Sequence, residues 1–293
     1  MCEVPVYASL ISGKPVEEGD LLPVYDKFTG KLFAQIRQPR KEDVRRAVGD
    51  AKRAQATEPF PMAKRYEVLM KAAGMMKERA HELADIMVAE AGKLKRDALN
   101  EVYWSVDLFV ESAEEAKRLH GETFSLPVPG LDQKTCYTIR MPVGVVAAIT
   151  PYNFPLNLAA HKVAPALAAG NAVVLKPATQ TPVIAFKLAE ILLAAGVPER
   201  YLHVLGGEGS TVGEWLLEDE RIDFYSFTGS VSVGKRIKER TGVRRVALEL
   251  GSNSATIVHG DADPIEAAKI CAQGAFSNAG QVCISVQRVY VHE

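Results

Sequence analysis

The sequence has few residues suited to a metal site and lacks the patterns of a membrane or nucleic-acid-binding protein. Its four cysteines, Cys2, Cys136, Cys271 and Cys283, show neither CxxC spacing nor histidines placed as metal ligands. This argues against a structural zinc site and a disulfide framework. The net charge is −1, and lysines and arginines are spread along the chain, so no basic footprint for nucleic acid is seen. Neither a secretory signal pattern nor an apolar run of membrane-spanning length is visible. We therefore expect a reduced, cytoplasmic protein without a metal.

The composition is ordinary for a globular protein of 293 residues, with 47% apolar and 24% charged residues. This length predicts about two domains. We expect strands in residues 1–40, with a turn at 28–31, and mainly helices in residues 41–119. A further strand outside the main sheet is expected at 134–141. The helical stretch has apolar residues at intervals of three or four, which is typical of core packing: Leu69, Ala73, Met76, Ala80, Leu83 and Met87.

The most regular part of the chain is the stretch 143–250. Apolar segments that predict strands lie at 145–149, 172–175, 202–205, 222–227 and 246–250. Segments that predict helices lie between them, at 157–169, 181–195, 210–219 and 230–241. This alternation indicates an α/β fold with a doubly wound parallel sheet, covered by helices on both faces. Ligands of such sheets bind beyond the carboxyl ends of the strands. The segments that follow the strands are therefore candidate binding loops.

Two of these segments are glycine-containing turns that open helices. The first, at 227–234, offers exposed backbone N–H groups that favour a phosphate, although it is not the GxGxxG fingerprint. An ordinary strand-to-helix turn capped by Ser230 is the alternative. For the second turn, at 207–213, the ordinary interpretation is favoured. Lys176, which follows another strand, could donate to ribose hydroxyls or to a phosphate, or could be a surface residue.

Three residues in separate segments have the chemistry needed to act on a carbonyl group. Cys283 lies in a short glycine-containing segment before the alternating run 286–291, as a nucleophile or as a small buried residue. Asn153 lies between Tyr152 and Phe154, and its amide could stabilise an oxyanion or belong to a turn. Glu249 lies in an apolar strand, where we expect it to be buried, either as a general base or in a salt bridge.

Together the motifs resemble those of the aldehyde dehydrogenase superfamily. The likeness is to the N-terminal part of members that act on small aldehydes, such as lactaldehyde or non-phosphorylating glyceraldehyde-3-phosphate dehydrogenases. It extends over essentially the whole chain and is densest from Pro142 to Val291. The motifs that carry it are Thr150-Pro151-Tyr152-Asn153-Phe154-Pro155, Lys176-Pro177-Ala178, Phe227-Thr228-Gly229-Ser230, Leu248-Glu249-Leu250-Gly251 and Gly280-Gln281-Val282-Cys283.

The resemblance implies NAD(P)-dependent oxidation of a small aldehyde to a carboxylic acid. Cys283 would attack the aldehyde to form a thiohemiacetal, and the Asn153 amide with the Cys283 N–H would hold the oxyanion. After hydride transfer a thioester remains on the thiol. Glu249 would activate the water that hydrolyses it, with Lys162 in a proton relay.

The resemblance also implies a Rossmann-like site for NAD or NADP. Many NAD-preferring relatives carry a carboxylate where this chain has Thr179, so we expect NADP to be tolerated or preferred. The implied cofactor contacts are Ile149, Thr150, Pro151, Tyr152, Lys176, Thr179, Gly209, Phe227, Thr228, Gly229, Ser230, Val233, Gly234, Leu250 and Gly251.

The domains implied by the resemblance are unequal in extent. Residues 1–119 and 143–250 would form the dinucleotide-binding domain, 120–142 an oligomerisation β-arm, and 251–293 the start of a truncated, partial α/β catalytic domain. A full-length form would be a homo-oligomer, a dimer or a tetramer, and this chain alone is expected to turn over weakly or not at all. Two alternatives stay open: a thioester hydrolase or acyl transferase that uses Cys283 and Glu249, and a cofactor-binding remnant without catalysis.

Overall fold

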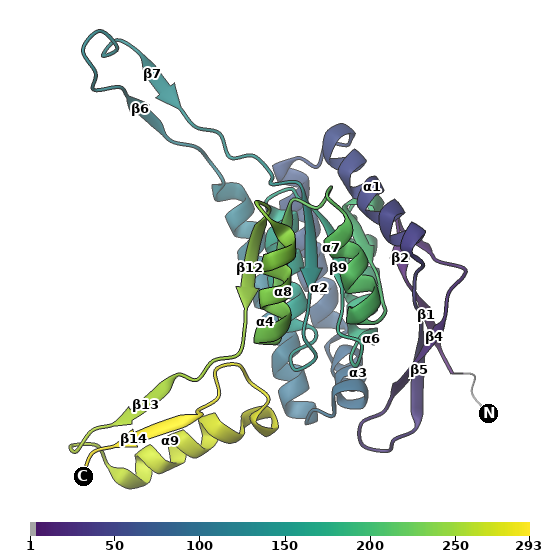
Figure 1. The fold of residues 1–293 in the computed structure, drawn as a ribbon, viewed down its shortest axis with the longest axis vertical. Helices are drawn as coiled ribbons and strands as arrows, with labels where there is room; N and C mark the ends of the chain where they lie inside the picture. The colour runs from purple at the N-terminus through teal and green to yellow at the C-terminus, as the bar shows by residue number, and fades with distance from the viewer. Residues whose placement is uncertain (1–3) are drawn as a thin grey trace.

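A seven-stranded sheet forms the centre of the computed structural model, which describes residues 4–293 (Figure 1). The strand order is β12-β11-β8-β9-β10-β2-β3, and the five strands from β12 to β10 run parallel. Their bounds, in that order, are Arg245–Glu249, Phe224–Thr228, Val145–Ile149, Ala172–Lys176, Leu202–Val204, Leu10–Ile11 and Lys14–Pro15. All five residues of β9 are buried, because helices cover both faces of the sheet. The predicted α/β doubly wound fold is confirmed.

Helices connect the parallel strands in chain order. These are α5 (Asn157–Ala168), α6 (Val183–Ala195), α7 (Glu214–Glu218) and α8 (Val231–Thr241). The chain runs outward from β8 through β9 to β10, and then crosses back to β11 on the other side of β8. This reversal makes the gap between β8 and β11 the topological switch point, where ligands of open α/β sheets bind.

Four helices precede the five parallel strands in the chain. They are α1 (Lys41–Thr57), α2 (Met62–Glu78), α3 (Ala80–Ala91) and α4 (Lys95–Arg118). Helices α2, α3 and α4 pack on α5 and α6, whereas α1 packs on the strands and on α7. The apolar stripe predicted between residues 69 and 87 is buried at all six positions. It continues across the break at Arg79, where α2 ends and α3 begins.

Smaller sheets lie outside this core. Near the N-terminus, β1 (Val6–Ala8), β5 (Leu32–Arg37) and β4 (Leu21–Tyr25) form a three-stranded sheet, as predicted for this strand-rich region. Strands β6 (Thr123–Ser125) and β7 (Thr135–Tyr137) pair in a hairpin that projects from the core (Figure 1). The strand expected at 134–141 is therefore only three residues long, although it does lie outside the main sheet. Cys2 and the rest of residues 1–3 lie outside the described residues.

The last part of the chain forms a separate layer on the lower side of Figure 1. It contains β13 (Ala255–Val258), α9 (Pro264–Phe276) and β14 (Arg288–Val291), and its two strands pair in parallel. Asp263 caps α9 by accepting from the backbone N–H groups of Ile265 and Glu266. Side chains of α9 are partly or fully exposed, and none is buried.

Three boundaries predicted from the sequence are wrong. Helix α6 begins at Val183, two residues later than the expected start at 181. Strand β11 begins at Phe224, two residues later than expected, because Asp223 turns its carboxylate back to the amino end of the sheet. The helix expected at 210–219 begins as a π-helical turn, Gly209–Gly213, before α7. No helix in residues 4–293 is long and apolar enough to cross a membrane.

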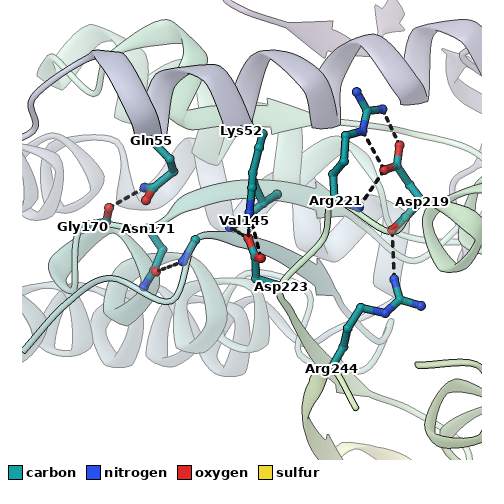
Figure 2. A network of polar contacts seen from close by, with 10 residues as sticks. Lys52, Gln55, Val145, Gly170, Asn171, Asp219, Arg221, Asp223 and Arg244 are labelled. Atoms are coloured by element: carbon teal, nitrogen blue, oxygen red, sulfur yellow. Dashed lines mark hydrogen bonds and ion pairs between the residues drawn. The ribbon is translucent and has the colours of Figure 1, made fainter. Parts of the chain in front are cut away.

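Charged side chains close the amino end of the sheet (Figure 2). Asp223 accepts from the backbone N–H of Val145 at 2.8 Å and from the Lys52 ammonium of α1 at 2.7 and 2.8 Å. Arg221 pairs with Asp219 at 2.6 Å. The Arg244 guanidinium donates to backbone carbonyls of residues 217, 219, 240 and 241 and to a tyrosine hydroxyl. These contacts join the loops at that end to one another and to α1.

Candidate active site

The opposite, carboxyl end of the sheet carries a cavity of about 820 Å³. Its walls are the segments that follow β8, β9, β10, β11 and β12, together with residues 280–283. Most residues singled out in the sequence line it: Ile149, Thr150, Pro151, Tyr152, Asn153, Lys176, Thr179, Gly209, Phe227, Thr228, Gly229, Ser230, Val233, Glu249, Leu250, Gly251 and Cys283. Two of them, Lys162 and Gly234, do not.

Cys283 is exposed and shares this cavity with Asn153. The Asn153 amide nitrogen donates to the Gln281 carbonyl at 2.8 Å, and the Asn278 amide donates to the Asn153 carbonyl at 3.3 Å. These two bonds connect the loop after β8 to the loop that carries the thiol. Cys283 is therefore not the small buried residue that was the alternative.

Glu249 is exposed, contrary to the burial expected from its apolar strand. The reason is its place in the sheet: β12 is an edge strand and Glu249 is its last residue. Its pairing partner on β11 is Thr228, which also lines the cavity. The carboxylate thus lies at the open end of the sheet and takes no part in a buried salt bridge.

Lys162 lies beneath the cavity, on α5. It is buried, and its ammonium donates to the Thr228 hydroxyl at 2.7 Å and the Ser226 hydroxyl at 3.3 Å. Burial lowers the pKa of Lys162 to about 8, and the charge of Glu249 partly offsets this effect. A lysine with such a pKa can exchange a proton near neutral pH.

Lys176 is the last residue of β9 and is buried, which excludes the surface position considered from the sequence. Its ammonium donates to the Pro177 carbonyl at 2.9 Å. Burial lowers the pKa of Lys176 to about 8, with the charge of Glu208 acting in the opposite direction. On the same loop, the Thr179 hydroxyl donates to the Gly207 carbonyl at 3.2 Å.

Helix α8 begins at the cavity wall. The Ser230 hydroxyl accepts from the Val233 N–H at 3.4 Å, so Ser230 is an N-cap as well as a lining residue. Gly234, one residue further on, serves packing: a Cβ there would lie 2.5 Å from a methyl carbon of Leu250. Its hydrogen therefore allows α8 to lie against the loop after β12.

Several lining residues were missed by sequence reasoning. Arg236 of α8 lines the cavity and pairs with Glu214 at 2.8 Å. The spacing of Ser230, Val233 and Ile237 along one helix face was the available signal. The others are Leu158, Ala178, Gln180, Ser210, Gly213, Glu214, Leu217, Ile237, Gly280, Gln281 and Val282.

Among the described residues, the histidines and cysteines form no metal centre. Within residues 4–293, no group of three or more His, Cys, Asp or Glu side chains is placed to hold a metal ion. His203 is buried and accepts from the backbone N–H of Ser12, and burial lowers its pKa to about 4. It has a structural role, since it joins the segment around β2 to β10.

Comparison with known proteins identifies the family of this chain. Residues 15–293 match the sequence model of the aldehyde dehydrogenase family. The chain belongs to that family. It is 48% identical over 295 residues to a 3-sulfolactaldehyde dehydrogenase of Priestia aryabhattai, an alignment covering 100% of this chain and 61% of that protein. A lactaldehyde dehydrogenase of Methanocaldococcus jannaschii is 37% identical, with 97% of this chain and 61% of the relative covered.

A solved structure gives the same result for the fold. The NADP-dependent glyceraldehyde-3-phosphate dehydrogenase from Bacillus halodurans, complexed with NADP, superposes with a TM-score of 0.95 at 37% identity, covering 98% of this chain and 61% of that one. The chain thus spans about three fifths of the length of the curated relatives it matches. None of these comparisons favours the hydrolase alternative.

Proposed function

We propose that this protein serves the NAD(P)-dependent oxidation of a small aldehyde to a carboxylic acid, with Cys283 as the nucleophile. The observation that carries the proposal is that Cys283, Asn153 and Glu249 line one cavity with the loops of a Rossmann-type sheet. A thiol, an amide donor and a carboxylate are the groups that covalent chemistry on a carbonyl requires.

The thiol and the amide act in the first step. The Cys283 sulfur forms a bond to the aldehyde carbon, and the carbonyl oxygen takes the negative charge. The Asn153 amide nitrogen carries two hydrogens and uses one for the Gln281 carbonyl, so the other remains for this oxyanion. A preorganised donor of this kind stabilises the transition state by about 3–4 kcal/mol.

The carboxylate acts in the second step, the hydrolysis of the thioester on Cys283. Glu249 takes a proton from water, whose oxygen bonds to the acyl carbon, and the carbon–sulfur bond breaks to release the thiolate. Lys162 serves as a proton relay for Glu249. Its ammonium donates to the hydroxyl of Thr228, and Thr228 on β11 is the residue paired with Glu249 on β12.

The residues present fit a dinucleotide. The cavity is within the size range of cofactor sites, and the start of α8 presents backbone N–H groups that suit a pyrophosphate. Lys176 keeps donors beyond the one used for Pro177 and can reach ribose hydroxyls or a phosphate. When bound, the dinucleotide supplies the hydride acceptor that turns the thiohemiacetal into the thioester.

We also propose that NADP is tolerated or preferred over NAD. Thr179 lines the cavity with a neutral hydroxyl, so it does not repel a 2′-phosphate as a carboxylate would. Glu208, whose charge acts on Lys176, lies outside the lining residues. The values of kcat/KM for the two cofactors test this proposal, and a wide margin in favour of NAD would refute it.

The proposed substrate is a small polar aldehyde, of the kind named for the lactaldehyde and 3-sulfolactaldehyde dehydrogenases.

We further propose that residues 120–142 form an oligomerisation arm between the subunits of a homo-oligomer, since the hairpin projects from the core with Tyr137, Ile139 and Met141 exposed. Residues 251–293 would begin the catalytic domain, because they bring the thiol to the cofactor loops.

One experiment tests the proposed reaction directly. Purified protein is mixed with lactaldehyde and NADP or NAD, the reduced-nicotinamide absorption is followed, and the acyl adduct is located by peptide mass after acid quenching. We expect slow aldehyde-dependent reduction, in keeping with the weak turnover expected of this chain alone, and an adduct on Cys283. Labelling at another residue, or thioester hydrolysis without any nicotinamide reduction, would contradict the proposal.

A further inference from the structure

Helix α5 begins four residues after Asn153 and lacks a side-chain cap of its own. Its N-cap position is occupied by Leu156, which has no side-chain acceptor for the first N–H groups of the helix. The acceptor comes from α4: the Glu101 Oε1 atom accepts from the N–H of Leu156 at 2.9 Å and of Asn157 at 3.0 Å. A carboxylate at a helix start stabilises it through both hydrogen bonds and the helix dipole.

Lys93, which pairs with Glu101, also contacts Phe154, the residue after Asn153. The Lys93 ammonium lies 2.7 Å from Glu101 Oε2, as an ion pair without the geometry of a directed hydrogen bond. The same ammonium lies 3.7 Å from the centre of the Phe154 ring. Both charged side chains are almost completely excluded from solvent.

Keeping two charges in the interior is costly, and a local serine or aspartate would cap α5 at lower cost. What the buried pair adds is a rigid connection between the helical layer and the segment 154–157. On its other side Asn153 is fixed by the Gln281 and Asn278 contacts. We propose that Glu101 is a positioning residue that sets the Asn153 amide for the oxyanion, with Lys93 as the buried counter-charge of its carboxylate; this inference rests on the proposed function.

The chain supplies a matched control in Glu90 of α3. Its carboxylate is also buried, and it accepts from the N–H groups of Val183 at 2.8 Å and Ile184 at 2.9 Å, where α6 begins. Helix α6 likewise has no side-chain cap of its own. Glu90 thus caps the helix after β9 as Glu101 caps the helix after β8, but the loop next to it does not carry Asn153.

Two double variants isolate the cap from the ion pair. Lys93→Met/Glu101→Gln removes both charges but keeps a side-chain carbonyl for Leu156 and Asn157. Lys93→Met/Glu101→Leu removes the charges and the acceptor. We expect the first to keep kcat within about threefold of wild type, and the second to lower it by about 10- to 100-fold with the KM for aldehyde little changed.

Glu90→Leu is the control for lost stability. We expect it to lower the Tm about as much as Lys93→Met/Glu101→Leu, while kcat at saturating cofactor stays near wild type. Equal loss of kcat in these two variants would mean that the cap is merely structural, and would overturn the inference.

A double-mutant cycle with Asn153→Ala shows whether Glu101 acts through that amide. In an Asn153→Ala background, adding Lys93→Met/Glu101→Leu should change kcat by less than about twofold, because the positioned group is already absent. Multiplication of the two losses would refute the inference. If wild type reduces no cofactor with any aldehyde, the proposed function fails instead. Amide hydrogen exchange at Leu156 and Asn157 then tests the cap by itself: exchange as slow in the Leu variant as in the Gln variant would refute it.

Discussion

The two ends of the parallel sheet are built from the same strands but use their polar groups differently. At the amino end, Asp223 and Arg244 bind backbone groups, and Asp223 and Asp219 pair with Lys52 and Arg221, so that the polar groups satisfy one another within the protein (Figure 2). At the carboxyl end, Lys162 and Lys176 are buried with neutral hydrogen-bond partners, and the loops surround a cavity. The first arrangement favours stability and the second leaves charge available for a ligand. Substitutions at the two ends should therefore separate folding from function.

The largest effect is expected at the carboxyl end, from Cys283→Ala. Without the sulfur no covalent adduct forms, so aldehyde oxidation should fall by about 10³-fold or more. Because the side chain is exposed, the free energy of unfolding should change by less than about 0.5 kcal/mol. Steady-state kinetics and urea unfolding measure the two quantities. Retained oxidation would show that another residue is the nucleophile.

Asn153→Ala should follow, with kcat lowered by about 10²- to 10³-fold through loss of an oxyanion donor. Binding of the dinucleotide alone should be nearly unchanged, because the amide is assigned to the aldehyde. Fluorescence titration with the reduced cofactor provides that control. A loss confined to cofactor affinity would assign Asn153 to the cofactor site.

At the amino end the expected effect is on stability. Arg244→Ala removes the donor for four backbone carbonyls and for the Tyr225 hydroxyl, and should lower the free energy of unfolding by about 2–3 kcal/mol. Dinucleotide affinity at a temperature where the variant is folded should match wild type. Weakened cofactor binding without lower stability would remove the distinction between the two ends.

The smallest effect concerns pH. The folded-state pKa of Lys162, about 8, lies below its unfolded value. Between these values the unfolded chain binds the extra proton, so stability rises with pH above about 8. Lys162→Met should remove this part of the rise, about 1 kcal/mol between pH 8 and 9.5. Urea unfolding across that range measures it, with Lys52→Met, at the amino end, as the control. Equal slopes in wild type and Lys162→Met would contradict the assigned pKa.

Local patterns were enough to predict the sheet, because β8 and β9 are short apolar segments between helices with regular spacing. The lining positions of Ser230 and Thr179 followed from motifs that lie just after strands. The exposure of Glu249 could not be predicted, since the sequence does not say that β12 is an edge strand. The cap on α5 could not be predicted either, because Glu101 lies 55 residues before Leu156, whose N–H it binds, and only the fold brings the two together.

The loop before the thiol has a backbone that its own residues do not prefer. Asn278, Ala279 and Gly280 all have positive φ, at 48°, 56° and 75°, and for alanine the left-handed region costs about 1 kcal/mol or more. The loop is therefore kept in shape by bonds with the Asn153 segment, 125 residues earlier in the chain. The Asn278 amide donates to the backbone carbonyl of Asn153, so a change at Asn278 should loosen this loop whichever side chain follows Tyr152. The shape of the thiol loop is thus encoded at a distance, in the backbone path of the segment after β8.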